Sequence, residues 1–113
     1  MLPKRLLSSP TATTMRSMLQ YVIQKGSLNE VMLPELNVAG KTGTADYFDE
    51  ATKHYIYDEF TLTFVGMFPA DKPKVTMIVS LQKPQTAKMS TVVAAPLFAK
   101  IAQDIAALWQ PSP

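Results

Sequence analysis

The chain has 113 residues, 47% of them hydrophobic, and a formal net charge of +2. This length supports one small domain with a modest core, folding by itself or as part of something larger. The lysines are scattered among acidic residues, which argues against a nucleic-acid partner. Without cysteine there is no disulfide framework and no thiolate zinc site. No apolar run approaches the ~20 residues that span a bilayer, and the N-terminal residues lack the apolar core of a signal peptide.

The first predicted element is a helix over residues 10–25. Ser9 is the expected N-cap, Pro10 suits the first helical turn, and Gly26 is the expected terminator. Apolar side chains recur at helical spacing on one face of this helix: Ala12, Met15, Leu19 and Val22. Residues 26–36 have no clear period and contain a proline, so we expect a loop there.

Three strands are predicted next, over residues 37–45, 60–68 and 74–82. The first contains glycines, which in a strand usually mark the close approach of a ligand or another backbone. The second places alternate side chains on one face: Phe60, Leu62, Phe64 and Phe68. Residues 69–73 form a turn by composition, which makes the second and third strands an antiparallel hairpin. The polar and aromatic residues 46–59 are expected to form a rim loop or a hairpin excursion.

A final helix is predicted over residues 92–109, with Pro96 confined to its first turn. Its apolar positions are Val93, Leu97, Ile101, Ile105 and Leu108. The order helix, three strands, helix indicates an α+β fold, an antiparallel sheet of about three strands flanked by an N-terminal and a C-terminal helix. The third strand is apolar enough to need a neighbour on its free edge, so the sheet looks incomplete. We therefore expect the isolated chain to self-associate through this edge.

The stretch VAGKTGTADY, from Val38 to Tyr47, allows two interpretations. Gly40-Lys41-Thr42 matches the end of a Walker phosphate loop, which needs an earlier glycine at position 35 and a helix directly afterwards. Position 35 is Glu35, and an aromatic and acidic stretch follows Thr42. Both requirements fail, so no nucleotide cofactor is expected. The alternative is Lys-Thr-Gly on a strand, a motif of penicillin-binding proteins and class A β-lactamases.

Three sequence blocks carry a resemblance to one family: PELNVAGKTGTA at residues 34–45, FVGMFPAD at 64–71 and AAPLF at 94–98. In this order and spacing they resemble the C-terminal part of the transpeptidase domain of a class B penicillin-binding protein. The strand end SLQKPQ, residues 80–85, is more weakly similar to Gram-positive members. The resemblance covers nearly the whole chain. It implies an incomplete piece of the serine β-lactamase and penicillin-binding transpeptidase fold, with residues 1–113 as the C-terminal segment of that domain.

The resemblance also assigns roles to residues of the motif. Acyl transfer at a serine needs a positive charge near the nucleophile, hydroxyls for the substrate carboxylate, and a backbone N–H for the developing oxyanion. By resemblance, Lys41 supplies the charge as the catalytic residue. Thr42 and Thr44 supply the hydroxyls, and the N–H of Thr44 supplies half of the oxyanion hole. Gly43 leaves room for the substrate against the strand.

The nucleophile of this family lies in a Ser-x-x-Lys motif at a helix start, and a Ser-x-Asn loop completes the site. Ser80 and Lys83 match the first pattern, but residues three apart on a strand point to opposite faces and cannot share a proton. Residues 27–29 match the second, but they follow a helix directly, where a turn is the simpler explanation. We therefore expect this segment to lack the nucleophile, and expect Met1 to interrupt a longer protein.

The resemblance implies part of a serine D,D-transpeptidase that cross-links peptidoglycan, with no cofactor and no metal. The expected partners of the full-length parent are the peptidoglycan stem peptide, β-lactams and the remainder of the transpeptidase domain. The parent is expected at the extracytoplasmic face of the bacterial cell membrane, and this chain alone is expected to be inactive. The alternative is a non-catalytic remnant, or a split-chain module that acts only by associating with a complementary chain.

Overall fold

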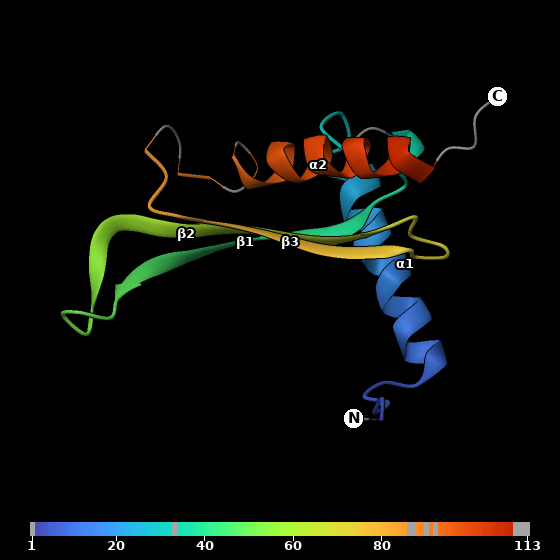
Figure 1. The fold of residues 1–113 in the computed structure, drawn as a ribbon, viewed down its shortest axis with the longest axis horizontal. Coiled ribbons are helices and arrows are strands. Elements are labelled where there is room, and N and C mark those ends of the chain that lie inside the picture. The colour runs from blue at the N-terminus through green and yellow to red at the C-terminus, as the bar shows by residue number, and fades with distance from the viewer. Residues whose placement is uncertain (1, 33, 86–87, 90, 92, 110–113) are drawn as a thin grey trace.

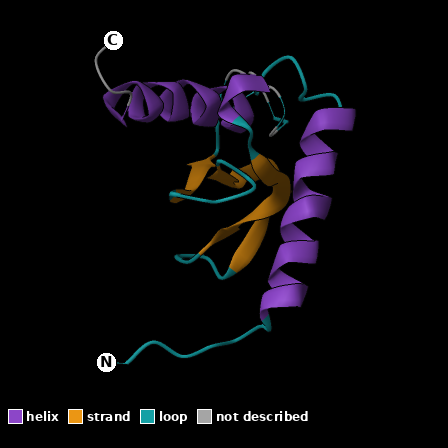
Figure 2. Ribbon diagram, turned by 90° about the vertical axis from the view of Figure 1, so that its right-hand side faces the viewer, coloured by secondary structure: helices purple, strands orange, loops and turns teal. Residues whose placement is uncertain are grey.

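The computed structural model describes residues 2–32, 34–85, 88–89, 91 and 93–109. Its elements in chain order are helix α1 (Ser9–Lys25), a short 3-10 helix η1 (Pro34–Leu36), strands β1 (Ala39–Asp49), β2 (His54–Phe68) and β3 (Val75–Gln82), and helix α2 (Ala94–Trp109). The strands form one antiparallel sheet in the order β1-β2-β3. Helix α2 lies along one face of the sheet, and α1 stands beside it against β1 (Figures 1 and 2). The predicted α+β arrangement is confirmed.

Helix α1 begins one residue earlier than the sequence predicted. The N-cap is Ser8 rather than Ser9, because the backbone N–H of Thr11 donates a hydrogen bond of 3.2 Å to the Ser8 hydroxyl. Pro10 lies in the first turn, where no intrahelical N–H is needed. The helix ends at Lys25, and Gly26 follows it as expected.

The buried side of α1 also differs from the prediction. Ile23 is its one residue in the buried core among those described, whereas Met15 and Val22 of the predicted apolar face are exposed. The reason is that the half-buried and buried side of α1, which packs against β1, runs through Ala12, Arg16 and Ile23, and Met15 and Val22 lie outside it.

The core lies between the sheet and α2 and is centred on aromatic rings. The ring of Phe98 lies 4.6 Å from that of Phe64 and 6.1 Å from that of Phe68, measured between centroids. Gly66 lies beneath this ring, since a Cβ added there would be 2.8 Å from Phe98 Cζ. The remaining buried positions of α2 are alanines, which let the helix approach the sheet closely: Ala94, Ala95, Ala99 and Ala102.

This packing corrects the face predicted for the final helix. Leu97 and Leu108 were expected on the apolar face, but both are exposed. Ile101 and Ile105 border the core and are only partly buried. The helix packs on the sheet through the alanines around Phe98, because small side chains allow a short distance between helix and sheet. A stripe of leucines and isoleucines would prevent this short distance.

Strands β1 and β2 continue well beyond β3 as a two-stranded ribbon (Figure 1). The pairing of β2 with β3 ends at Thr61 and Gln82, whereas β1 and β2 stay paired as far as Asp49 and His54. Residues 46–59, predicted as a rim loop or hairpin excursion, are therefore mostly strand. The register shifts between Asp46 and Phe48, and this bulge hid the alternation from the sequence.

The start of β1 is fixed by hydrogen bonds to Asn37. Its side-chain oxygen accepts from Gln20 Nε2 on α1 at 2.6 Å, and its side-chain nitrogen donates to Asp71 at 3.0 Å. The carbonyl of Asn37 also accepts from the N–H of Ala70 at 2.7 Å. Asn37 has a φ of 51°, in the left-handed region that asparagine tolerates better than most residues. These bonds join α1, β1 and the turn after β2, and so position the strand that carries Lys-Thr-Gly.

Candidate active-site strand

The Lys-Thr-Gly-Thr motif occupies the middle of β1, which is an edge strand of the sheet. Because side chains alternate along a strand, Lys41 and Gly43 share one face, and Thr42 and Thr44 share the other. Thr42 pairs with Phe64, whose ring packs under α2, so the two threonines lie on the α2 side. Lys41 lies on the opposite side, which α2 leaves uncovered. The motif therefore presents its side chains around the open edge of β1.

The ammonium of Lys41 is exposed and available to an anion. Its only side-chain contacts within the described ranges are long hydrogen bonds of 3.4 Å to the carbonyl oxygen and the hydroxyl of Thr42. No described carboxylate lies within ion-pair distance of it; the two ion pairs found in the described ranges involve Lys53 and Lys88. A cation held on a strand without an acidic partner is suited to bind a substrate carboxylate.

Two glycines of β1 differ in what surrounds them. A Cβ added at Gly40 would lie 2.7 Å from both Phe64 Cζ and the Val65 carbonyl oxygen, so packing requires glycine there. Among the described residues, a Cβ added at Gly43 would meet the Cβ of Thr63 at the ordinary contact distance of 3.8 Å. Packing against the described residues therefore does not require glycine at position 43.

The two motif matches rejected in the sequence do not form catalytic sites in the structure. Ser80 lies exposed on β3, with the hydroxyl of Thr63 donating to its oxygen at 3.4 Å. The ammonium of Lys83 lies elsewhere, 4.9 Å from the centroid of the Tyr47 ring. Residues 27–29 lie in the turn after α1, where the N–H of Asn29 donates to the Gly26 carbonyl at 3.3 Å.

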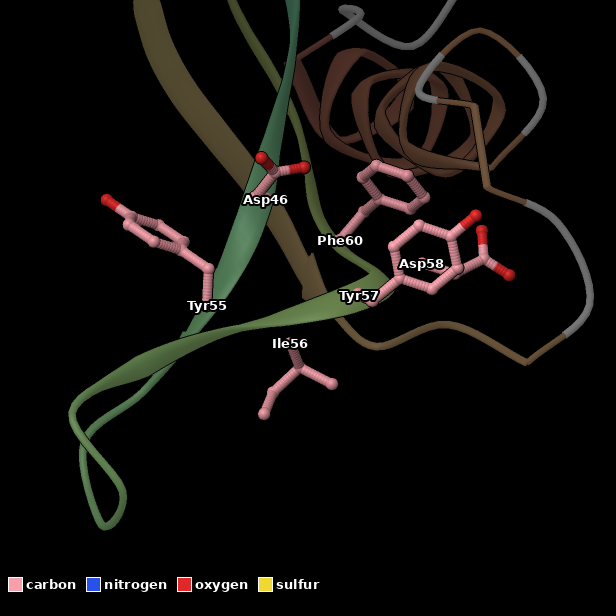
Figure 3. Close-up of a pocket in the computed structure, with 6 residues that line it drawn as sticks. All are labelled: Asp46, Tyr55, Ile56, Tyr57, Asp58 and Phe60. Atoms are coloured by element: carbon pink, nitrogen blue, oxygen red, sulfur yellow. The ribbon is translucent and has the colours of Figure 1, made fainter.

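Sequence reasoning missed a hollow of about 570 Å³ beyond the motif, on the two-stranded ribbon (Figure 3). Its lining residues are Asp46, Tyr55, Ile56, Tyr57, Asp58 and Phe60. Asp58 has a φ of 61°, which bends β2 at this point. The alternation of Tyr55 and Tyr57 is typical of a strand. The acidic residues within residues 46–59 instead favoured the prediction of a loop.

Lys88 binds Asp58, one of the residues that line this hollow. It donates to the carbonyl oxygen and to the carboxylate of Asp58, each at 2.8 Å. The hydrogen bond to the Asp58 carboxylate raises the pKa of Lys88, helped by the negative charges of Asp58 and Glu59 and opposed by slight desolvation. The Lys88 ammonium therefore stays charged at neutral pH, and the contribution of this shift to stability is lost only as the pH rises above the ordinary lysine range.

His54 lies exposed at the start of β2. Within the described ranges no three histidine, aspartate or glutamate side chains come together as a metal site. None of the helices described there is long and apolar enough to cross a bilayer.

Comparison with known proteins decides the family. Residues 2–103 match the family model of the penicillin binding protein transpeptidase domain. The chain belongs to this transpeptidase family. The family and the partial α+β fold predicted from the sequence are thereby confirmed.

Curated relatives of this transpeptidase segment are much longer than the segment itself. Penicillin-binding protein PbpB of Mycolicibacterium smegmatis is 36% identical over 107 residues, which cover 87% of this chain and 16% of the relative. Stage V sporulation protein D of Bacillus subtilis is 29% identical over 102 residues, covering 89% of this chain and 16% of that protein. The segment thus spans about one sixth of the length of these relatives.

Solved structures share the fold of the transpeptidase segment. A putative peptidoglycan glycosyltransferase from Atopobium parvulum superimposes with a TM-score of 0.81 at 27% identity, covering 97% of this chain and 26% of that one. Penicillin-binding protein 3 of Mycobacterium tuberculosis, complexed with ampicillin, gives a TM-score of 0.72 at 28% identity over 96% of this chain and 27% of that one. The same protein complexed with aztreonam gives 0.73 at 31% identity, covering 96% and 27%.

Proposed function

We propose that this segment forms one wall of the active site of a serine D,D-transpeptidase that cross-links peptidoglycan and is acylated by β-lactams. The observation that carries the proposal is the Lys-Thr-Gly-Thr motif in the middle of an edge strand, in a chain of the transpeptidase family. Lys41 is the proposed catalytic residue, and Thr42, Gly43 and Thr44 are the proposed substrate-binding residues. The nucleophilic serine is supplied from outside these 113 residues.

The geometry of β1 suits this chemistry. Lys41 lies on an edge strand and provides a positive charge for the carboxylate of a peptide substrate. In the proposed acylation, the serine oxygen bonds to the carbonyl carbon and the amide or lactam C–N bond breaks. The serine proton passes to the departing nitrogen. The N–H of Thr44 would donate to the oxyanion that develops between these events.

We propose that the remainder of the transpeptidase domain covers the face of the sheet opposite α2 and pairs with the outer edge of β3. Ile78 on β3 is 64% exposed, and Val65 beside it on β2 is also exposed. No described strand pairs with that edge. The complete enzyme is proposed to act at the extracytoplasmic face of the cell membrane on the stem peptides of peptidoglycan.

Replacing Gly43 by alanine tests the proposed wall. In the complete transpeptidase we expect the rate of acylation by a fluorescent penicillin to fall about tenfold or more, equivalent to ~1.4 kcal/mol, because the new methyl group occupies the ligand's space. The free energy of unfolding from a urea titration is expected to change by less than ~1 kcal/mol, since the described neighbour of the added Cβ is Thr63, at the ordinary contact distance of 3.8 Å. The matched control is Gly40→Ala, which is expected to destabilise the fold. Unchanged acylation by the Gly43 variant would contradict the proposed wall.

Sedimentation velocity tests whether the exposed sheet is an association surface. The isolated chain is expected to sediment as a dimer or larger species, because no described strand pairs with the β3 edge and Ile78 is exposed. Ile78→Lys is expected to shift it toward monomer, whereas Leu108→Lys, on α2 and 83% exposed, is the control without effect. A monodisperse wild-type monomer would refute self-association. It would also weaken the alternative function, a non-catalytic module that acts only by pairing with another chain.

A further inference from the structure

We infer that the hollow on the two-stranded ribbon binds a primary ammonium group on a peptide, and that in the proposed transpeptidase this peptide is the acceptor strand. The inference rests on the proposed function, which places the acyl donor against the neighbouring motif. Its evidence is the chemistry of the lining, its position along β1, and the way the chain's own Lys88 is bound there.

The lining combines aromatic rings with carboxylates, which is the chemistry that recognises an ammonium. Tyr57 is 97% exposed and Tyr55 is also largely exposed, so their rings are accessible to a ligand. Figure 3 shows the carboxylate of Asp46 between the ring of Tyr55 on one side and that of Phe60 on the other. Among the described residues nothing forms a side-chain hydrogen bond or an ion pair with Asp46. A cation placed there gains both a charge-assisted hydrogen bond and ring contacts.

The hollow lies beside the Lys-Thr-Gly-Thr motif. Asp46 lies two residues beyond Thr44 on the same face of β1, about 7 Å further along the strand. The bulge that follows Asp46 and the left-handed backbone of Asp58 bend the ribbon where the hollow forms. A donor bound along Lys41 to Thr44 and an amine bound at Asp46 would therefore be neighbours.

Lys88 shows that one of the lining residues, Asp58, binds a primary ammonium. Its ammonium binds both the carbonyl oxygen and the carboxylate of Asp58 at 2.8 Å. Asp58 is thus occupied by a lysine of the same chain, and Asp46 is the open carboxylate of the hollow. Releasing Lys88 would provide a second carboxylate for the ligand.

Before the proposed transfer, the ammonium leaves the hollow's carboxylate and loses one proton to solvent, because only the neutral amine has a lone pair. The amine nitrogen then bonds to the acyl carbon while the ester C–O bond to serine breaks, and a second proton passes from this nitrogen to the serine oxygen. The role of the hollow precedes this step: it collects the amine-bearing chain from solution and holds it beside the acyl group.

Nuclear magnetic resonance titration of the isotopically labelled chain tests the inference. The probe is Nα-acetyl-Lys-D-Ala-D-Ala with a free ε-amine, and the control ligand is the same peptide with that amine acetylated. We expect the free amine to shift the amide resonances of residues 46 and 55–60, and acetylation to weaken binding about fivefold or more. Asp46→Asn is expected to weaken binding of the free amine by a similar factor. Glu50→Gln, an acid at the ribbon tip outside the hollow, is expected to leave it unchanged.

Lys88→Met provides a further readout, because it is expected to strengthen binding of the free amine about twofold or more by releasing Asp58. Equal binding of the two peptides, shifts mapped outside the hollow, or full binding by the Asp46 variant would each overturn the inference. The penicillin acylation experiment on Gly43→Ala measures only the reaction of the acyl donor with the enzyme. A loss of acylation there together with no amine preference here would remove the acceptor site and leave the proposed function standing.

Discussion

Replacing Lys41 by alanine is expected to lower the rate of acylation of the complete transpeptidase by a fluorescent penicillin about 100-fold or more. The magnitude is that of removing one preorganised electrostatic group from an acyl-transfer site. Lys41 is exposed on the motif strand, and no described carboxylate neutralises it, so its full charge is available to the ligand. The measurement is the second-order rate of covalent labelling, compared between wild type and variant at equal concentrations of folded enzyme.

Two controls make the Lys41 result specific. Lys53→Ala removes another exposed lysine, which pairs with Glu50 at 2.8 Å on the ribbon tip, and is expected to leave the rate unchanged. The chain incubated alone with the same penicillin is expected to take no covalent label. Normal acylation of the Lys41 variant would refute the role given to that lysine, and covalent labelling of the chain alone would refute the proposal that the nucleophile lies elsewhere.

Replacing Phe98 by alanine is expected to destabilise the chain by about 3–5 kcal/mol. The side chain is 0% exposed, and its ring contacts Phe64 and Phe68 across the interface between α2 and the sheet. Its loss leaves a cavity over Gly66 that the surrounding alanines are too small to fill. The measurement is the free energy of unfolding from a urea titration followed by circular dichroism.

The matched control for Phe98 is Leu108→Ala on the same helix. Leu108 is 83% exposed, so its truncation is expected to change the unfolding free energy by less than ~0.5 kcal/mol. A loss below ~1.5 kcal/mol for the Phe98 variant would show that α2 is not held to the sheet mainly by this ring.

The sequence predicted the parts of the fold whose pattern is local. Alternation in residues 60–68 and 74–82 gave the second hairpin and its buried face, and Gly26 gave the end of α1. The packing faces of both helices could not be read in this way. Met15 and Val22 have helical spacing but lie outside the buried side of α1, which runs through Ala12 and Ile23. Helix α2 packs through alanines because Phe98 lies close to Gly66. Which face of each helix is buried depends on how the helix packs against the sheet. The periodicity of the sequence carries no information about that packing.

In the candidate site, too, the contiguous part could be predicted from the sequence and the part formed by strand pairing could not. The Lys-Thr-Gly-Thr motif is contiguous, so the sequence alone marked Lys41 to Thr44. The hollow joins Asp46 to Tyr55 and Phe60 through strand pairing, with a bulge and a left-handed residue at its bend. Neither the bulge nor the left-handed residue is a glycine, so the sequence contains no local sign of them. The acidic residues in this segment instead favoured the prediction of a loop. The difference between Gly40 and Gly43 likewise becomes visible only once the neighbouring strand is in place.

Because β1 and β2 extend beyond β3, mutations that affect ligand binding and mutations that affect stability fall in different parts of the sheet. Beyond Thr61 no described strand pairs with the ribbon as a third strand, and the core residues described above lie almost entirely in the three-stranded part. Mutations in the ribbon can therefore alter charge and shape beside the motif with little effect on folding, whereas mutations beneath α2 alter stability first. This division gives descendants of the protein a region in which ligand preference can diverge while the architecture that holds Lys41 in place is inherited intact.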